Sequence, residues 1–203
     1  MEITSLKLKS KRNANVFICE TDVGVFDLHS DIIVKNGIKV GIVDDEKFRE
    51  SVNQSAEIIA FNLASKYVGN RLKTEKQIKD YLYKHEYKKC VVDFVVDKLK
   101  EYKIIDDKIY AETYIRTNPN YSKNKVKQKL MGFGVKTENM EEELDVVDDF
   151  ASCLKHAEKY LKNKNMDKQT LDKLVRRLAG LGYNWDTIKS VLYKLKYEMD
   201  DDE

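Results

Sequence analysis

The sequence is poor in proline, glycine and cysteine, with one, eight and three residues of these types among 203. Little proline and glycine, together with 42% hydrophobic residues, exclude a collagen-like, low-complexity or fully disordered chain. Cys19, Cys90 and Cys153 are widely separated along the chain, which fits neither a zinc site nor the disulfide framework of a small secreted domain. The cysteines therefore indicate a reducing compartment.

Long apolar segments are also missing. No apolar run is long enough to span a membrane, and residues 1–11 lack the apolar core of a signal peptide. We therefore expect a cytoplasmic protein without a membrane partner. No sustained heptad pattern is visible either, so we expect a monomer.

The motifs of common enzyme classes do not occur. There is no nucleotide-binding glycine loop, no HExxH and no Gly-x-Ser-x-Gly elbow. His29, His85 and His156 are scattered along the chain, and for His85 a structural role is favoured over a catalytic one. Asp106 and Asp107 are adjacent, which favours helix capping over a metal pair. We predict no enzyme activity, no cofactor and no metal site.

The clearest pattern that the sequence does contain is an internal repeat. Its equivalent positions include Ile78, Val126 and Leu174, which are equally spaced along the chain, and this spacing is the period of the repeat. Six apolar positions keep phase through three copies, starting at these three residues. Their spacing is typical of helices, so we expect them to be core positions. The other five positions are Leu82, Leu130 and Leu178; Tyr87, Val135 and Tyr183; Val92, Met140 and Ile188; Val96, Leu144 and Leu192; and Leu99, Val147 and Leu195.

Signals for helix ends repeat with the same period. Thr74, Ser122 and Thr170 lie four residues before the first apolar position of each copy, where a hydroxyl side chain can cap a helix N-terminus. Gly134 and Gly182 lie where a left-handed turn would end that helix. Each copy also has an amphipathic stretch before the cap, so we predict three helices per copy.

Residues 1 to about 50 show a different pattern. Leucine and lysine alternate over residues 6–9, and β-branched residues are enriched at 16–18 and 32–34. Turn residues occur at 13–15 and 36–37. The pattern predicts two or three short β-strands, which need support from the first helix or serve as an arm.

The predicted fold is mainly α: three tandem three-helix repeats in an elongated array, with a short N-terminal β-hairpin segment. Because a unit of roughly 50 residues is near the lower size limit for independent stability, neighbouring copies are expected to support each other. The predicted division is residues 1–52 for the β-hairpin extension, 53–103, 104–149 and 150–199 for the three repeats, and 200–203 for an acidic tail.

The formal net charge of +2 hides a periodic distribution of charge. Residues 66–90 and 155–178 each contain eight basic and three acidic residues, and residues 121–136 contain five lysines and no acid. Residues 138–149 contain seven acids and no base, and residues 200–203 are all acidic. We predict that the front helices of the copies are basic, each with a net charge of +5.

Two interpretations of the basic helices are open. For any single helix a solvated surface is the default. Recurrence of the same sign favours a basic track for a nucleic-acid backbone or for an acidic groove on a protein. Arginines come first among the expected contacts, because a guanidinium fork binds carboxylate or phosphate more specifically than an ammonium group does. The candidate partner-binding or nucleic-acid-binding residues are Arg71, Lys73, Lys76, Arg116, Lys123, Lys125, Lys127, Lys129, Lys173, Arg176 and Arg177.

A set of motifs accompanies the repeats. They are Arg71-Leu72-Lys73-Thr74; Ile105-Asp106-Asp107 followed by Tyr110-Ala111 and Tyr114-Ile115-Arg116; the lysine-rich helix into Leu130 and Phe133-Gly134-Val135; and Leu178, Leu181, Gly182 and Tyr183. With the tandem three-helix units, they resemble the RecX family of regulators of the RecA recombinase, over roughly residues 55–195. The sequence departs from the family pattern at Glu86, at Tyr110 and at Asn118-Pro119-Asn120.

The resemblance implies a protein that lies in the helical groove of a RecA filament on single-stranded DNA. It implies that the protein limits filament growth, ATP hydrolysis and strand exchange in DNA recombination, DNA repair and the SOS response. The N-terminal β segment also resembles the extension of RecX proteins from low-GC Gram-positive bacteria. Two other functions stay open: a direct binder of single-stranded or double-stranded DNA with tandem helix-turn-helix-like units, and a helical adaptor scaffold.

Overall fold

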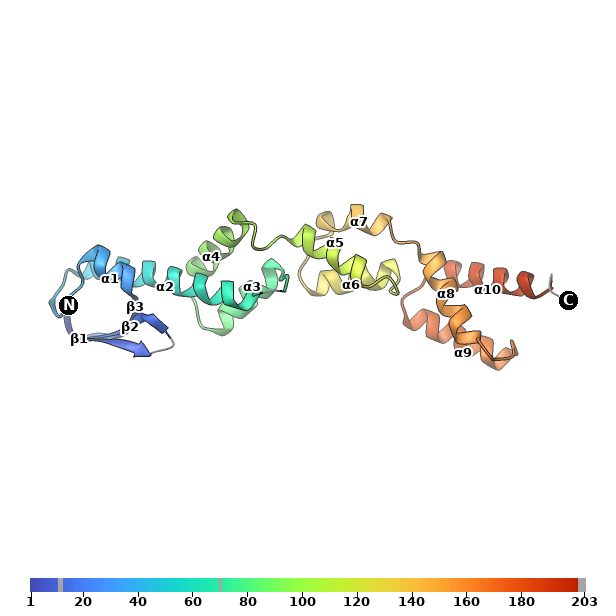
Figure 1. Cartoon of the computed structure of the whole chain (residues 1–203), viewed down its shortest axis with the longest axis horizontal. Helices are drawn as coiled ribbons and strands as arrows, with labels where there is room; N and C mark the ends of the chain where they lie inside the picture. Colours follow the sequence, from blue (N-terminus) through green and yellow to red (C-terminus); the bar gives the residue numbers. More distant parts are fainter. Residues whose placement is uncertain (11–12, 70, 201–203) are drawn as a thin grey trace. The chain divides into compact units, whose positions relative to one another are not determined.

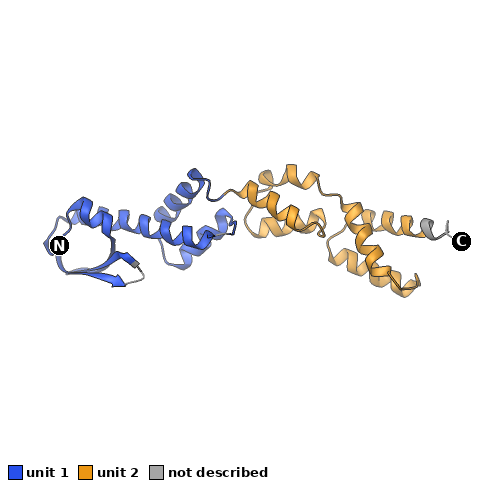
Figure 2. Ribbon diagram, viewed as in Figure 1, with its two compact units in different colours: residues 1–105 blue, residues 106–203 orange. Residues whose placement is uncertain are grey.

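The computed structural model describes residues 1–10, 13–69 and 71–200 and is mostly helical, with a small antiparallel sheet at the N-terminus (Figure 1). The predicted fold class, mainly α with an N-terminal β segment, is confirmed. The chain divides into two compact units, Met1–Ile105 and Asp106–Glu203 (Figure 2). Unit 1 contains β1 (Glu2–Ser10), β2 (Asn13–Thr21), β3 (Gly24–His29), α1 (Ser30–Asn36), β4 (Gly41–Ile42), α2 (Asp45–Val68), α3 (Glu75–Lys84) and α4 (Lys89–Glu101). Unit 2 contains α5 (Asp107–Thr117), α6 (Lys123–Gly132), the 3-10 helix η1 (Thr137–Asn139), α7 (Glu141–Asp145), α8 (Asp149–Leu161), α9 (Lys168–Gly180) and α10 (Trp185–Asp200).

The N-terminal region forms a four-stranded antiparallel sheet in the order β3-β2-β1-β4, so it is larger than the predicted hairpin. Alternation along β1 and β2 sends one set of side chains to the side where helix α2 packs. Ile3, Cys19 and Leu28 from the strands are buried there with Phe48 of α2. The helix supports the sheet, because small sheets gain stability by packing a hydrophobic face against a helix.

Two local predictions in this region are wrong. Residues 32–34 lie in helix α1, because the His29 side chain accepts the N–H of Asp31 at its start and Gly37, with φ of 62°, ends it. These end signals outweigh the β preference of Ile32–Val34. Residues 13–15 were predicted as a turn, but they begin strand β2, in which Asn13 pairs with Ser10 of β1.

Helix α2 belongs to two cores. It starts after Asp44, whose carboxylate accepts the N–H of Lys47 at 2.9 Å, and runs through the expected boundary between residues 52 and 53. Phe48 packs against the sheet, whereas Ala60 and Ala64 pack in the first helical core. The helix accordingly contacts both β3 and α4. The structure thus puts this boundary inside a helix, and the remaining division of the chain stays a prediction.

Each copy of the repeat has a hydrophobic core of its own, formed by α2–α4, α5–α7 and α8–α10. Fifteen of the eighteen aligned apolar positions are buried, and Tyr87, Val147 and Leu192 are half-buried. The prediction that the repeat positions form the core is therefore confirmed. The third helix of the second copy, α7, has only five residues.

Two of the three predicted helix caps are confirmed. The hydroxyl groups of Thr74 and Ser122 accept the N–H of the residue three positions on, at the start of α3 and α6. Thr170 is not a cap, because α9 starts earlier, after Asp167, whose carboxylate accepts the N–H of Thr170 at 2.7 Å. This hydrogen bond holds the pKa of Asp167 below its ordinary value.

The predicted turns after the first capped helix are also confirmed. Gly134 and Gly182 have φ values of 87° and 88°, in the left-handed region that favours glycine. The first copy has Glu86 at the equivalent position, with φ of 62°. The predicted capping role of Asp106 is confirmed as well, since its carboxylate accepts the N–H groups of Lys108 and Ile109.

Hydrogen bonds join the second and third copies within unit 2. The three shorter than 3.5 Å use a main-chain atom on one side and link positions far apart in the sequence, and a fourth, from Tyr183 Oη to the Asn120 carbonyl, is longer at 3.5 Å. The three shorter bonds are those from Ser122 Oγ to the Leu181 carbonyl (3.1 Å), from the Lys123 N–H to the Asp149 carboxylate (2.7 Å), and between His156 Nε2 and the Asn120 carbonyl (2.9 Å).

Candidate partner interface

The predicted contact residues of the first copy lie at and before the N-terminus of α3. Arg71 is exposed in the connection before the helix, and Lys73 Nζ lies 4.6 Å from the centre of the Tyr67 ring. Lys76 is engaged with Asp80, at 3.2 Å. In the part of the chain that the structure describes, Arg71 and Lys73 have no carboxylate partner. These two residues, rather than Lys76, keep their charge available to a partner.

The predicted lysines of the second copy do not share one face of α6. Residues four apart on a helix lie on the same side, whereas residues two apart point in nearly opposite directions. Lys123 and Lys127 therefore form one flank, and Lys125 and Lys129 form the other. Lys123 is bound within the unit, because its Nζ pairs with Asp145 at 2.7 Å. Arg116, another of the predicted contact residues, is exposed in the last turn of α5.

The predicted residues of the third copy are brought together. Lys173, Arg176 and Arg177 are exposed on α9 at positions i, i+3 and i+4, which places them on one side of the helix. Lys173 also helps to hold the pKa of Asp167 low, after the stronger effect of the hydrogen bonds from Thr170. The three predicted residues of this copy therefore lie close together, and their contact with a partner stays a prediction.

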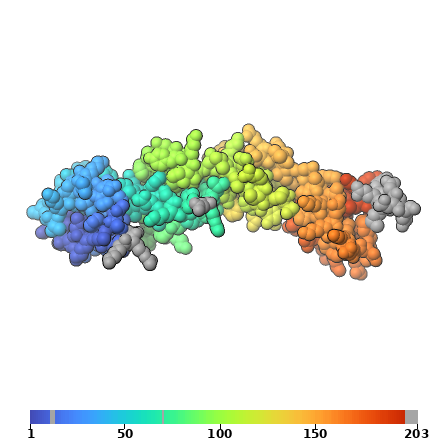
Figure 3. Space-filling model, in the orientation of Figure 1, coloured from blue at the N-terminus to red at the C-terminus, as the bar shows by residue number. Residues whose placement is uncertain are grey.

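Arg177 also lines a pocket with residues of helix α8 and of the connection that follows it. We call it the Tyr160 pocket; it has a volume of about 290 Å³. Lys164 Nζ lies 3.4 Å from the centre of the Tyr160 ring, and the guanidinium carbon of Arg177 lies 5.8 Å from it. Such cation–π contacts hold both side chains near the ring. The pocket is lined by His156, Lys159, Tyr160, Lys162, Lys164 and Arg177; α8 and α9, which contribute to it, are orange in Figure 3.

The cations of the Tyr160 pocket lack counter-charges. Elsewhere, lysines such as Lys79 and Lys108 pair with Glu75 and Glu142. Over residues 1–10, 13–69 and 71–200, no carboxylate pairs with any of the four lysines and arginines of this pocket. Like charges held close together without a partner create a positive potential that attracts an anion. A phosphate or a carboxylate group fits this chemistry.

Lys159, Lys162 and Lys164 were counted in the basic segment but not selected as contacts. They lie at the end of α8 and beyond it, in the connection to α9, where the helical period no longer indicates which side chains meet. One signal was present: these three lysines closely surround an aromatic residue, Tyr160, in the sequence. Basic residues interleaved with an aromatic residue are typical of surfaces that bind nucleic acid.

Some basic helix positions recur from one copy to the next. A shift by one repeat aligns Lys125 with Lys173 and Lys129 with Arg177. The first copy has uncharged residues at these positions, Gln77 and Tyr81. The same shift aligns Lys79 of α3 with Lys127 of α6. Each neighbouring pair of copies therefore shares basic helix positions, but these three alignments place no basic residue at the same position in all three copies.

The described residues contain no group of three or more His, Cys, Asp or Glu side chains that could hold a metal ion. None of the helices in the described ranges is long and apolar enough to cross a membrane. His29 caps α1, and His156 is bonded to the Asn120 carbonyl.

Comparisons with known proteins identify the family. A family model described as the first three-helix domain of RecX matches residues 60–99. "Regulatory protein RecX" of Clostridium botulinum (strain Alaska E43) is 34% identical over 202 residues, with 94% of each chain covered. The protein of the same name from Clostridium perfringens (strain SM101) is 33% identical over 204 residues, with 96% of each covered. The chain belongs to the RecX family. The names of these relatives describe RecX as a regulatory protein.

Solved RecX structures share the fold. One, titled "Crystal structure of regulatory protein RecX", has a TM-score of 0.67 and 19% identity, and the match covers 100% of this chain and 99% of that one. The structure of RecX from Lactobacillus salivarius has a TM-score of 0.63 and 23% identity, with 70% and 97% covered. The first RecX three-helix domain, as matched, comprises the C-terminal part of α2, all of α3 and most of α4.

Proposed function

We propose that this chain regulates the RecA recombinase by binding the RecA filament on single-stranded DNA, in its helical groove. In this proposal, the bound protein inhibits ATP hydrolysis, filament extension and strand exchange in DNA recombination and repair. Membership of the RecX family over nearly the whole chain carries the proposal. We further propose that the protein acts in the cytoplasm as a monomer and has no catalytic activity of its own.

The charge distribution of unit 2 supports this function. A filament on DNA offers phosphate groups and acidic protein surfaces, and both bind unpaired cations. Arg177 and Lys164 lie near the same ring and have no carboxylate partner among the described residues. We therefore expect the Tyr160 pocket to contribute more to filament binding than Lys123 or Lys76, which are engaged within the protein.

Strand exchange by purified recombinase tests the proposal. Wild-type protein at a concentration equal to that of RecA should slow strand exchange and ATP hydrolysis, and should sediment with filaments on single-stranded DNA. The double variant Arg177→Glu and Lys164→Glu should need at least about tenfold more protein for the same effect, since even one lost hydrogen bond to a charged group removes about 1.5–3 kcal/mol. The matched control is Lys189→Glu, an exposed lysine of α10 outside the pocket. Unchanged strand exchange at equal concentration of wild-type protein contradicts the proposed function.

Direct DNA binding is the second candidate, and the unpaired cations of the Tyr160 pocket favour it too. This function predicts binding to single-stranded or double-stranded DNA without recombinase, with an affinity that falls steeply as salt rises. The same double variant should then lower both the affinity and its dependence on salt. A footprint at a specific DNA sequence favours this candidate over filament binding.

A further inference from the structure

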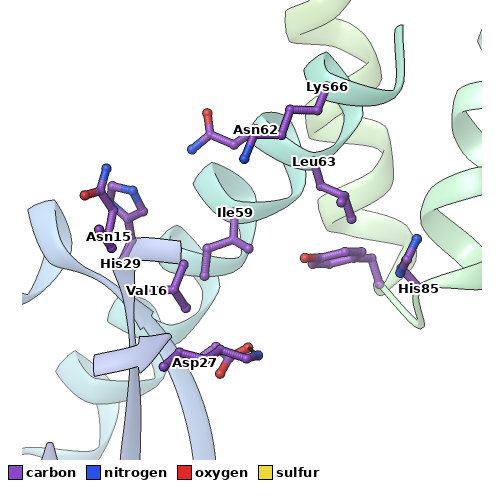
Figure 4. Close-up of a pocket in the computed structure, with 12 residues that line it drawn as sticks. Asn15, Val16, Asp27, His29, Ile59, Asn62, Leu63, Lys66 and His85 are labelled. Atoms are coloured by element: carbon purple, nitrogen blue, oxygen red, sulfur yellow. Dashed lines mark hydrogen bonds and ion pairs between the residues drawn. The ribbon is translucent and has the colours of Figure 1, made fainter. Parts of the chain in front are cut away.

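A second cleft, in unit 1, contains none of the residues predicted to contact a partner. It lies between the β-sheet, helix α2 and the turn between α3 and α4, and has a volume of about 520 Å³ (Figure 4). This volume is in the range of sites for small organic ligands. We call it the sheet–helix cleft; the residues that matter below are Asn15, Asp27, His29, Asn62, Lys66 and Tyr87.

His29 supplies a hydrogen-bond donor at the wall of the cleft. The side chain is buried, with a residue exposure of 4%, and its Nδ1 accepts the N–H of Asp31 at 3.3 Å. An imidazole that accepts through Nδ1 carries its proton on Nε2. Within the described part of the chain, Nε2 has no hydrogen-bond partner. Nε2 is not one of the buried polar atoms without a partner, so it is open to the cleft and can donate a hydrogen bond to a ligand atom there.

Further polar groups approach from helix α2. Figure 4 shows Asn15 and His29 on the sheet side, and the side chains of Asn62 and Lys66 extending from α2 toward the sheet. Lys66 has no carboxylate partner among the residues that the structure describes. Lys66 and His29 are therefore suited to hold a phosphate group.

The acidic side of the cleft is already neutralised. Asp27 is the only acidic residue of its lining in the described chain, and it pairs with Lys9. The unpaired charge that remains is positive. An anion is thus favoured over a cation as the ligand.

The rest of the cleft suits a flat, partly apolar group. Ile59 and Leu63 of α2 and Val16 of the sheet are apolar, and the half-buried Tyr87 provides an aromatic ring. The amides of Asn15 and Asn62 can each donate and accept hydrogen bonds, which matches the mixed donors and acceptors of a nucleobase edge. Nucleobases also stack on aromatic side chains in many single-strand binding sites.

We propose that the sheet–helix cleft binds a nucleoside phosphate, either a free nucleotide or one unit of single-stranded nucleic acid. The phosphate lies at Lys66 and His29, and the base lies against Tyr87 and the apolar side chains. This site is separate from the Tyr160 pocket and does not require the recombinase.

Titration of the full-length protein with dAMP, followed by calorimetry, tests the site. Lys66→Gln should weaken dAMP binding by about tenfold or more, because it removes a charge-assisted hydrogen bond. His29→Asn should also weaken it, while asparagine can still cap α1, so the variant separates loss of the donor from loss of folding. The matched control Lys47→Gln changes an exposed lysine in the first turn of α2 and should bind dAMP as the wild type does.

Competition then identifies the source of the nucleoside phosphate. Displacement of dAMP by a short oligothymidylate assigns the cleft to single strands, and failure of the oligonucleotide to compete assigns it to free nucleotides; both results support the proposal. Absence of dAMP binding at millimolar concentration contradicts it. Equal affinity in Lys66→Gln, His29→Asn and wild type contradicts it as well. Displacement by inorganic phosphate or by an acidic peptide as readily as by dAMP also overturns it, since the base would then contribute nothing.

Discussion

Replacing Gly182 by alanine is expected to destabilise unit 2. Gly182 has φ of 88°, and an alanine held in the left-handed region costs about 1–2 kcal/mol. Its Cβ would lie 2.6 Å from Ser122 Oγ and 3.1 Å from Lys125 Cβ, so the Ser122 side chain would have to move. That hydroxyl caps α6 and bonds to the Leu181 carbonyl, and each of these bonds contributes about 1 kcal/mol. We expect a total loss of about 2–4 kcal/mol in the free energy of unfolding.

Urea unfolding, followed by far-ultraviolet circular dichroism, measures this loss. Gly180→Ala is the matched control, because Gly180 ends helix α9 and, apart from its chain neighbours and the adjoining backbone of its own helix, nothing lies within 4 Å of the position that its Cβ would occupy. Alanine at a helical glycine stabilises by up to about 1 kcal/mol, so the two variants should shift the midpoint in opposite directions.

A double-mutant cycle separates the steric part from the backbone part. With Ser122→Ala already present, Gly182→Ala should cost less, mainly the backbone term of about 1–2 kcal/mol, because the clashing oxygen is gone and only the milder contact with Lys125 Cβ remains. A Gly182→Ala midpoint equal to or above that of Gly180→Ala would refute the reasoning. The same penalty with and without Ser122 would refute its steric part.

Three other outcomes are expected. Glu86→Gly should raise the free energy of unfolding by about 1 kcal/mol and with it the urea midpoint, because Glu86 has φ of 62°; a lower midpoint contradicts this. In native protein, an aromatic disulfide reagent should modify exposed Cys90 quickly, whereas Cys19 and Cys153 should react only after unfolding. Both of these thiols are buried, and burial raises the pKa of Cys153 to about 11. Three thiols that react at one rate would contradict this expectation. Glu75→Gln should lower stability by about 1 kcal/mol at neutral pH. Burial alone would raise the pKa of Glu75, but hydrogen bonds from two lysines outweigh it and hold this pKa below the ordinary 4.5. The stabilisation by Glu75 is therefore present above pH 4.5 and disappears as the pH falls through the lowered pKa. A difference in stability between Glu75→Gln and wild type that persists in acid contradicts this.

The helical cores could be predicted because their information is local and periodic. Leucines and valines at helical spacing can be buried in only one arrangement of each helix, and the internal repeat gives three independent readings of the same positions. Thr74 and Ser122 were found in the same way. Thr170 was not a cap because a carboxylate three residues earlier, on Asp167, accepts the same N–H and starts the helix sooner.

The candidate sites depended on contacts that no period records. Arg177 was selected for its residue type, but its neighbours Lys162 and Lys164 meet it only through the turn between α8 and α9. In unit 1, β-branched residues 32–34 indicated a strand, and the cap provided by His29 made them helical. The same histidine lines a cleft that is assembled from a strand, a helix and a distant turn. Such sites require the three-dimensional packing of segments that the sequence keeps apart.

The bonds between the second and third copies have a consequence for how these proteins diverge. The atoms used at Leu181, Lys123 and Asn120 are a carbonyl oxygen, an amide N–H and another carbonyl oxygen, and most residue types offer the same atoms. Mutations at these three positions can therefore accumulate without loosening the joint, while Ser122, Asp149 and His156 supply the side chains. The hydrogen bonds between the two copies can therefore persist while many residues on the surrounding surface are substituted.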